Sequence, residues 1–150
     1  MKTAGRINFH TFCALSFFSF GTAMMDYFLV YPSRAIVGED EFVSYHSLLE
    51  NAIIPVSVLP FLVITIQNIF LFWSRPANVE KGLIVISLCC LLLDWTSSIL
   101  VQIPLNLQLN NGKDMMLIQQ VIDTNWGRVF LESLQAFFVL IMMVKGDSST

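Results

Sequence analysis

Four long stretches of apolar residues constrain this chain more than any other feature. They run from 9 to 30, from 51 to 73, from 82 to 107 and from 127 to 144. A bilayer core of about 30 Å needs roughly 20 helical residues to cross it, so each stretch is long enough to span a membrane. The sequence therefore predicts an all-α integral membrane protein, a four-helix bundle that forms one domain over residues 1–150.

Composition agrees with this interpretation. Apolar residues make up 55% of the chain and charged residues 13%, whereas soluble domains contain roughly 25% charged residues. The net charge is −3 and the basic residues are scattered, so nucleic acid is not an expected partner. No cysteine pair has the spacing of a zinc or redox motif, and no phosphate-binding loop or nucleophile elbow is present. Membrane lipid is the expected surrounding.

Proline, glycine and asparagine mark the expected helix ends. Tyr31-Pro32 is predicted to end the first helix, Arg75-Pro76 the second and the run 110–112 the third. Residues 41–50 contain neither glycine nor proline, which predicts a helix leading directly into the second span. Residues 114–125 alternate apolar and polar side chains at helical spacing, which predicts a helix along the membrane interface before the fourth span.

Basic residues favour cytoplasmic termini. With four spans, the two termini and the middle loop share one side, which contains five basic residues against three on the other. The five are Lys2, Arg6, Arg75, Lys81 and Lys145, and the three are Arg34, Lys113 and Arg128. Cytoplasmic segments of membrane proteins carry an excess of Lys and Arg. The loops that contain residues 31–50 and 108–126 are therefore expected outside.

Polar residues inside the spans indicate which faces point into the bundle. In the first span Ser16, Ser19, Thr22 and Asp26 recur every three or four residues, which places them on one helix face. Small polar residues can simply pack helices together. Charged residues need a stronger explanation, because an ionised side chain in hydrocarbon is costly unless it faces protein or water.

The strongly polar residues converge on the outer half of the predicted bundle. We predict from this asymmetry a water-accessible pocket that opens outward and binds a ligand. The predicted pocket residues are Asp26, His46, Glu50, Gln102, Asn106, Trp126, Arg128 and Glu132. The alternative is a salt-bridge cluster that locks the helix ends, in which Arg128 pairs with Glu132 at i and i+4 and Asp26 is a second acceptor.

Asp94 is expected near the membrane centre, where a carboxyl group is rare. It is interpreted either as a buried hydrogen-bond anchor or as a group with a proton-linked or catalytic role. The anchor would bond one of several polar residues on neighbouring helices, namely Ser16, Ser19, Thr65 or Asn68.

His46 and Glu50 share a helix face and could ligate a metal only if Glu132 or Asp26 completed the shell. Two residues at helical spacing often arise by chance. No metal is expected.

Two motifs resemble a known family. The stretch Thr96 to Asn106 reads Thr-Ser-Ser-Ile-Leu-Val-Gln-Ile-Pro-Leu-Asn, and Asn-Trp-Gly-Arg follows at 125–128. Both resemble the anthrone oxygenase-like family of small four-helix membrane proteins, in which Pro-x-Asn ends the third helix and a Trp with a following Arg opens the fourth. Tyr-Pro-Ser at 31–33 and Phe-x-x-Tyr-His at 42–46 are similar to a related bacterial group.

The resemblance implies that Pro104, Asn106, Trp126 and Arg128 contribute to the site and that the chain lies in a bacterial inner membrane. It also implies oxidation of a hydrophobic small molecule without a cofactor. The chain departs from the pattern in lacking the His that the family often carries between Trp and Arg.

Two functional hypotheses follow. The first is an enzyme or binding protein that accepts a hydrophobic small molecule from the membrane. The second is a non-enzymatic subunit or scaffold whose polar residues only stabilise the bundle. A channel or transporter is a third and would require homo-oligomers, because one chain supplies few helices for alternating access.

Overall fold

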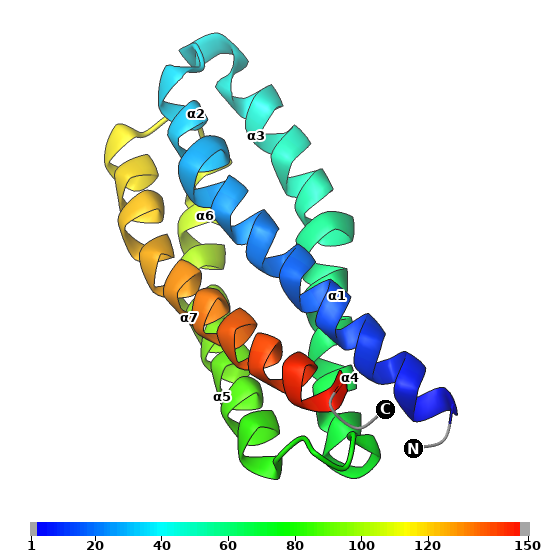
Figure 1. Ribbon diagram of the computed structural model, residues 1–150. Helices are drawn as coiled ribbons and strands as arrows, with labels where there is room; N and C mark the ends of the chain where they lie inside the picture. The colour runs from blue at the N-terminus through cyan, green and yellow to red at the C-terminus, as the bar shows by residue number, and fades with distance from the viewer. Residues whose placement is uncertain (1–2, 148–150) are drawn as a thin grey trace.

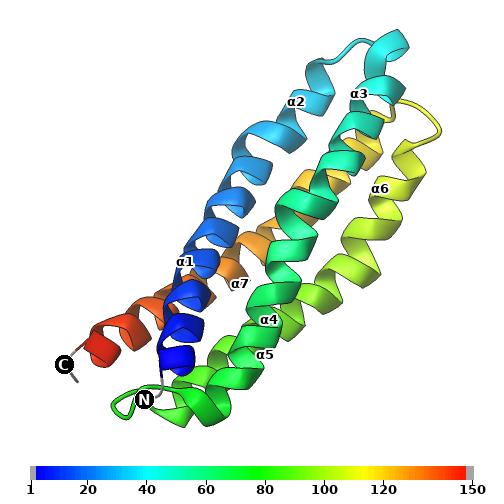
Figure 2. The same cartoon turned by 90° about the vertical axis from the view of Figure 1, so that its right-hand side faces the viewer.

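The computed structural model describes residues 3–147 and confirms the predicted fold class. Four helical rods, each long and apolar enough to cross a membrane, cover Thr3–Ile36, Glu39–Ser74, Lys81–Leu109 and Met115–Gly146. They lie side by side in an elongated bundle with short connections (Figures 1 and 2). The chain is an integral membrane helical bundle, and Lys2 of the charge count lies outside the described residues.

Three of the rods contain a π-helical turn between two α-helices, and the fourth is unbroken. The first rod consists of α1 (Thr3–Met25), η1 (Asp26–Val30) and α2 (Tyr31–Ile36). The second consists of α3 (Glu39–Ile53), η2 (Ile54–Val58) and α4 (Leu59–Ser74). The third consists of α5 (Lys81–Ser97), η3 (Ser98–Gln102) and α6 (Ile103–Leu109). The fourth rod is α7 (Met115–Asp147).

The π-helical turns carry the rods past prolines. Pro32, Pro60 and Pro104 each follow a residue whose N–H is bonded to the carbonyl five residues back. A proline lacks an N–H and clashes with the carbonyl four residues back, and a π-helical turn widens the helix just before that clash. The prediction that Pro32 ends the first helix is therefore wrong, since the helix continues to Ile36.

The other predicted helix ends agree better with the structure. The second rod ends at Ser74, directly before Arg75-Pro76, and the third ends at Leu109, before Asn110. Gly112 has φ +135°, a conformation that side chains rarely adopt. Residues 41–50 are helical within α3 and run into the second span, as predicted.

The helix predicted along the membrane interface at 114–125 is instead the beginning of α7. The Asp114 carboxylate accepts hydrogen bonds from the backbone N–H groups of Met116 and Leu117, which caps this helix start. Ile118 and Val121 are buried in a cluster with Tyr31, Phe42 and Leu109. Their apolar face therefore packs against protein.

The two ends of the bundle differ in character. The start of α1, the end of α7 and the α4–α5 connection lie at one end, here named the terminal end (Figure 1). The α2–α3 and α6–α7 connections lie at the other (Figure 2). Glu39, Asp40, Glu41 and Asp114 stand beside those connections, so this is named the acidic end.

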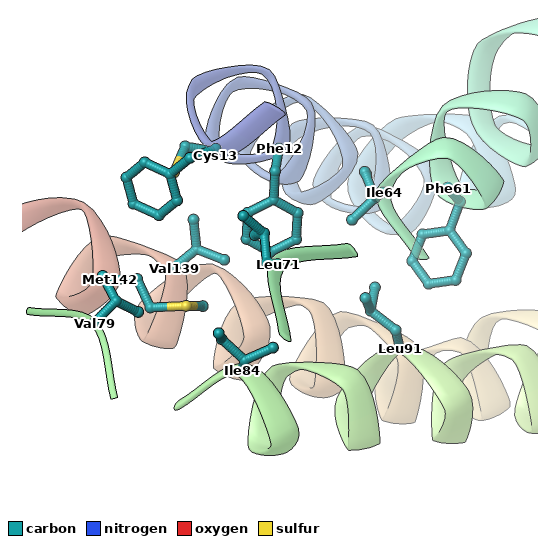
Figure 3. Packing of buried hydrophobic residues seen from close by; sticks show 11 residues of the cluster. Phe12, Cys13, Phe61, Ile64, Leu71, Val79, Ile84, Leu91, Val139 and Met142 are labelled. Carbon is teal, nitrogen blue, oxygen red and sulfur yellow. The ribbon is translucent and has the colours of Figure 1, made fainter. Parts of the chain in front are cut away.

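The half of the bundle towards the terminal end is closed by apolar packing. Phe12, Ile64, Leu71, Ile84 and Met142 are at most 1% exposed and come from all four rods. Figure 3 shows these side chains converging between the helices. Close packing of this kind holds membrane helices together, because lipid tails supply no hydrophobic drive for association.

An ion pair between Lys145 and Glu80 joins α7 to the α4–α5 connection. The hydrogen bond from the Lys145 ammonium and its charge lower the pKa of the Glu80 carboxyl. A carboxyl group whose pKa is lowered in the folded state stabilises that state at neutral pH, and this stabilisation is lost as the pH falls through the lowered pKa.

We expect Glu80→Gln to lower Tm slightly at pH 7 and low salt, and to have no effect in acid. Thermal unfolding of both proteins across pH and salt measures this, and a pH-independent difference would contradict it.

Candidate functional site

A cavity of about 630 Å³ lies in the half of the bundle towards the acidic end. All four rods line it, and each of the three π-helical turns contributes residues. Part of the wall is apolar and includes Ala23, Val56, Phe61 and Trp95. This volume is within the range of about 300–1,000 Å³ typical of small-molecule sites.

Six of the eight predicted pocket residues line this cavity. They are Asp26, Glu50, Gln102, Asn106, Arg128 and Glu132. They come from η1, α3, η3, α6 and α7, so residues far apart in the sequence meet in the half of the bundle where the sequence placed its strongly polar residues. Their role in ligand binding stays a prediction.

Trp126 and His46 do not line the cavity. Trp126 is 57% exposed and its ring packs against Tyr27 with centroids 5.2 Å apart, so it faces away from the bundle interior. His46 is fully buried, and its Nε2 lies 3.1 Å from the carbonyl oxygen of Asn106. His46 therefore supports the cavity wall from behind.

Arg128 joins two buried carboxyl groups at the floor of the cavity. Its Nε donates to Oδ1 of Asp94 at 3.1 Å, and its Nη2 lies 3.5 Å from Oε1 of Glu132. Ser19 donates to the other Glu132 oxygen at 2.8 Å. The predicted pair Arg128–Glu132 is present, but the second acceptor is Asp94 instead of Asp26.

The cluster of Asp94, Arg128, Glu132 and Ser19, here named the ion cluster, connects α1, α5 and α7. The side chain of Asp94 is 1% exposed, that of Glu132 6% and that of Arg128 15%. One cation faces two carboxyl groups, so the cluster is neutral only when one carboxyl carries a proton. The predicted bonding of Asp94 to Ser16, Ser19, Thr65 or Asn68 is replaced by this ion pair.

Buried polar side chains continue from the ion cluster towards the terminal end. Gln135 donates to Ser16 at 3.1 Å and to Ser87 at 3.4 Å, and Asn68 donates to Ser87 at 2.7 Å. These residues come from all four rods. Here the interpretation that small polar residues pack the helices together fits the structure, because each amide donates to a hydroxyl on a neighbouring helix.

Arg34 is a second buried cation on the cavity wall. It is 3% exposed, and its Nη1 donates to Oδ1 of Asn106 at 2.6 Å. The guanidinium carbon lies 4.9 Å from the centre of the Tyr31 ring. Within residues 3–147 no carboxylate oxygen lies within 4.0 Å of it, and its Nε is buried without a hydrogen-bond partner.

Sequence reasoning missed Arg34 as a site residue and counted it as a loop charge. The reason is the predicted helix end at Pro32, which would have released the following residues from the helix. With the helix continued, Arg34 lies eight residues after Asp26 and extends the same polar face. That spacing was the available signal.

The metal alternative has no geometric support in the part of the chain that the structure describes. Across residues 3–147 no three His, Cys, Asp or Glu side chains gather closely enough to hold an ion. His46 and Glu50 approach to 3.6 Å, but neither Asp26 nor Glu132 completes a shell with them.

The site combines an apolar wall, a paired cation at the floor and a cation without a counter-ion near the acidic end. Such a surface can hold an elongated molecule that is apolar at one end and polar at the other. The chain matches no family model, no curated protein and no solved structure. The resemblance to anthrone oxygenase-like proteins therefore rests on the sequence motifs.

Proposed function

We propose that this protein binds a hydrophobic small molecule in the cavity and takes it from the surrounding membrane. One observation carries the proposal: an apolar bundle, closed by packing in one half, retains in the other a cavity of about 630 Å³ with strongly polar residues on its wall. Protein interiors are close-packed, and a void of this size is far larger than ordinary packing defects.

The position of the cavity along the bundle suits an amphipathic ligand. Counting about 20 residues outward from Trp73 reaches Ile53, and from Gly82 it reaches Gln102. The hydrocarbon boundary then falls near the π-helical turns. Phe61 and Trp95 lie on the hydrocarbon side of this level, and Arg34 lies on the water side, so an apolar body and a polar group would each meet a matching wall.

Exposed apolar residues on the wall support entry from the side. Met25, Ile54, Val58, Ile103 and Leu107 line the cavity, yet each is 37% to 57% exposed. Near the hydrocarbon boundary, such residues form an apolar opening through which a membrane-dissolved molecule can enter the cavity.

We further propose that the acidic end faces outward and the termini face the cytoplasm of a bacterial cell, with the protein in the inner membrane. The basic residues Arg6, Arg75, Lys81 and Lys145 stand at the terminal end. At the acidic end, Arg34 and Arg128 are taken up in the bundle, and Lys113 donates to the carbonyls of Ala35 and Val37. The contrast between the two ends therefore follows the positive-inside tendency.

The cavity favours ligand binding over the scaffold hypothesis. A scaffold needs tight packing throughout, whereas Arg128 and Asn106 here border open volume. Arg128 is nevertheless a poor residue for testing binding, because it also neutralises Asp94 and Glu132. A test of binding has to reduce the open volume without disturbing charge.

We expect Ser98→Phe to weaken binding by at least about tenfold, or roughly 1.4 kcal/mol. Ser98 lines the cavity, so the added ring would occupy ligand space, whereas Thr96 on the same rod is exposed and does not line it. Trp95 is the reporter: with Trp73 and Trp126 replaced by Phe, quenching of its fluorescence by bromododecanol measures occupancy. Thr96→Phe is the matched control. Quenching that is unsaturable, or equal in both variants, would contradict the proposal.

A further inference from the structure

We infer that the cavity selects an anionic amphiphile, an oxyanion on a long apolar chain, and that Arg34 is the residue that binds the oxyanion. This inference rests on the proposed function and names the ligand class of the same site. The inference starts from Arg34, a residue that lines the cavity and is only 3% exposed.

The two arginines on the wall differ in how their charge is compensated. Arg128 has two carboxylate oxygens within 3.5 Å, at Asp94 and Glu132. Arg34 has one neutral acceptor, the amide oxygen of Asn106, and a buried Nε without a partner within the described residues. A buried cation without a counter-ion is costly, and a buried donor without an acceptor adds to that cost.

A guanidinium presents its donors as a rigid fork that matches carboxylate and phosphate oxygens, so an oxyanion in the cavity would supply the counter-charge that Arg34 lacks. Asn106 holds the fork in place: its side-chain oxygen accepts from Arg34, and its side-chain nitrogen donates to the carbonyl of Gln102 at 2.7 Å. His46 lies 3.1 Å from the backbone oxygen of the same residue. The site is therefore built before any ligand arrives.

The acidic residues on the cavity wall determine whether a charged ligand is attracted or repelled there. Asp26 and Glu50 also line the cavity, and neither is within ion-pairing distance of Arg34. Glu50 is engaged by His46 at 3.6 Å and by Asn110 at 3.4 Å. An anionic ligand would be repelled by Asp26 and attracted by Arg34, whereas a cationic ligand would show the opposite pattern.

The apolar chain of the ligand fits the other part of the same wall. From Arg34 the cavity extends past Ala23 and Val56 to Phe61 and Trp95, which lie deeper in the bundle. A ligand with its oxyanion at Arg34 and its chain along these residues has the orientation of a membrane lipid in the outer leaflet. Carboxylate and phosphate share this chemistry, and the experiment separates them.

The test measures quenching of Trp95 by three brominated twelve-carbon probes at pH 8: dodecanoate, dodecyl phosphate and dodecanol. We expect one or both anions to bind at least about tenfold more tightly than dodecanol. The tighter anion identifies the headgroup class. Arg34→Gln should remove this preference, so that the anions and dodecanol bind that variant about equally. Arg6→Gln changes an exposed arginine at the terminal end and should leave the preference intact.

Asp26→Asn supplies a test of sign. It removes a charge from the wall without removing a side-chain hydrogen bond or ion pair recorded among residues 3–147, and should tighten anion binding roughly threefold or more. If neither dodecanoate nor dodecyl phosphate binds more tightly than dodecanol, the inference is overturned and the proposed function still stands. Tighter binding of bromododecylamine than of either anion would overturn it as well. No saturable quenching by any probe would refute both. These comparisons use the protein with Trp95 as its single tryptophan and Arg34 in place, so they decide the matter even if Arg34→Gln fails to fold.

Discussion

Replacing Arg128 by Met is expected to cost the bundle about 3–5 kcal/mol of its free energy of unfolding. The methionine would leave Asp94 and Glu132 buried without the cation that now lies within 3.5 Å of each. The side chains of Asp94 and Glu132 are only 1% and 6% exposed, so water could replace little of the lost compensation. Unfolding of the protein by sodium dodecyl sulfate in mixed micelles, followed by circular dichroism, measures the loss.

Removing the carboxylates distinguishes the effect of unpaired buried charge from the effect of lost side-chain packing. Asp94→Asn with Glu132→Gln in the Arg128→Met background should recover most of the lost stability, because the uncompensated charges are gone. Arg6→Met removes an exposed arginine from α1 and should cost no more than about 0.5 kcal/mol. If Arg128→Met is as stable as the natural protein, the ion cluster does not hold the bundle together.

The second large effect is expected at Phe12. Phe12 is fully buried between the rods (Figure 3), whereas Phe18 on the same helix is 47% exposed. Phe12→Ala should destabilise by about 3 kcal/mol, since it opens a cavity in close-packed interior. Phe18→Ala should cost less than about 1 kcal/mol, because lipid fills the space that the lost ring leaves.

This pair tests what holds the closed half of the bundle. Both substitutions remove the same apolar surface from the same helix, so a difference between them in mixed-micelle unfolding reports packing against protein. Equal losses at Phe12 and Phe18 would contradict the claim that Phe12 packs against protein while Phe18 faces lipid.

The number of helices could be predicted from the sequence, because the hydrocarbon thickness requires uninterrupted apolar stretches of a length that other structures seldom need. The helix ends could be predicted only where the chain must turn. Pro76 follows an actual end, but Pro32 lies inside a continuous rod. Proline leaves two solutions, a stop or a π-helical turn, and packing of Tyr31 against α6 and α7 residues selects the second.

Which residues line the cavity could largely be predicted from their position along the helices. Which charged side chains pair with one another could not. Asp26, Asn106 and Glu132 are at the right level and on polar faces, so they converge whichever way the helices settle. Whether Arg128 meets Asp26 or Asp94 depends on the rotation of α7 about its axis, and so does the direction of Trp126. Rotation is set by packing across several helices, which no single stretch of sequence contains.

The π-helical turns relate the fold to the proposed function. Each π-helical turn interrupts the regular i to i+4 hydrogen-bond pattern of its rod and contributes residues to the cavity wall. The half towards the terminal end has no such turn among the described residues and is packed. The closed half is close-packed, and the half with three π-helical turns contains the cavity in which we propose that a ligand binds.

The most direct test of the central claim is to map where a membrane-dissolved amphiphile touches the protein. A diazirine-bearing dodecanoate is photolysed with the protein in lipid nanodiscs, and adducts are located by peptide mass spectrometry. Binding in the cavity predicts saturable adducts on the interior residues Ala23, Phe61 and Trp95, competed by excess dodecanoate. Adducts confined to exposed residues such as Phe70, Leu92 and Phe137, with no competition, would contradict it.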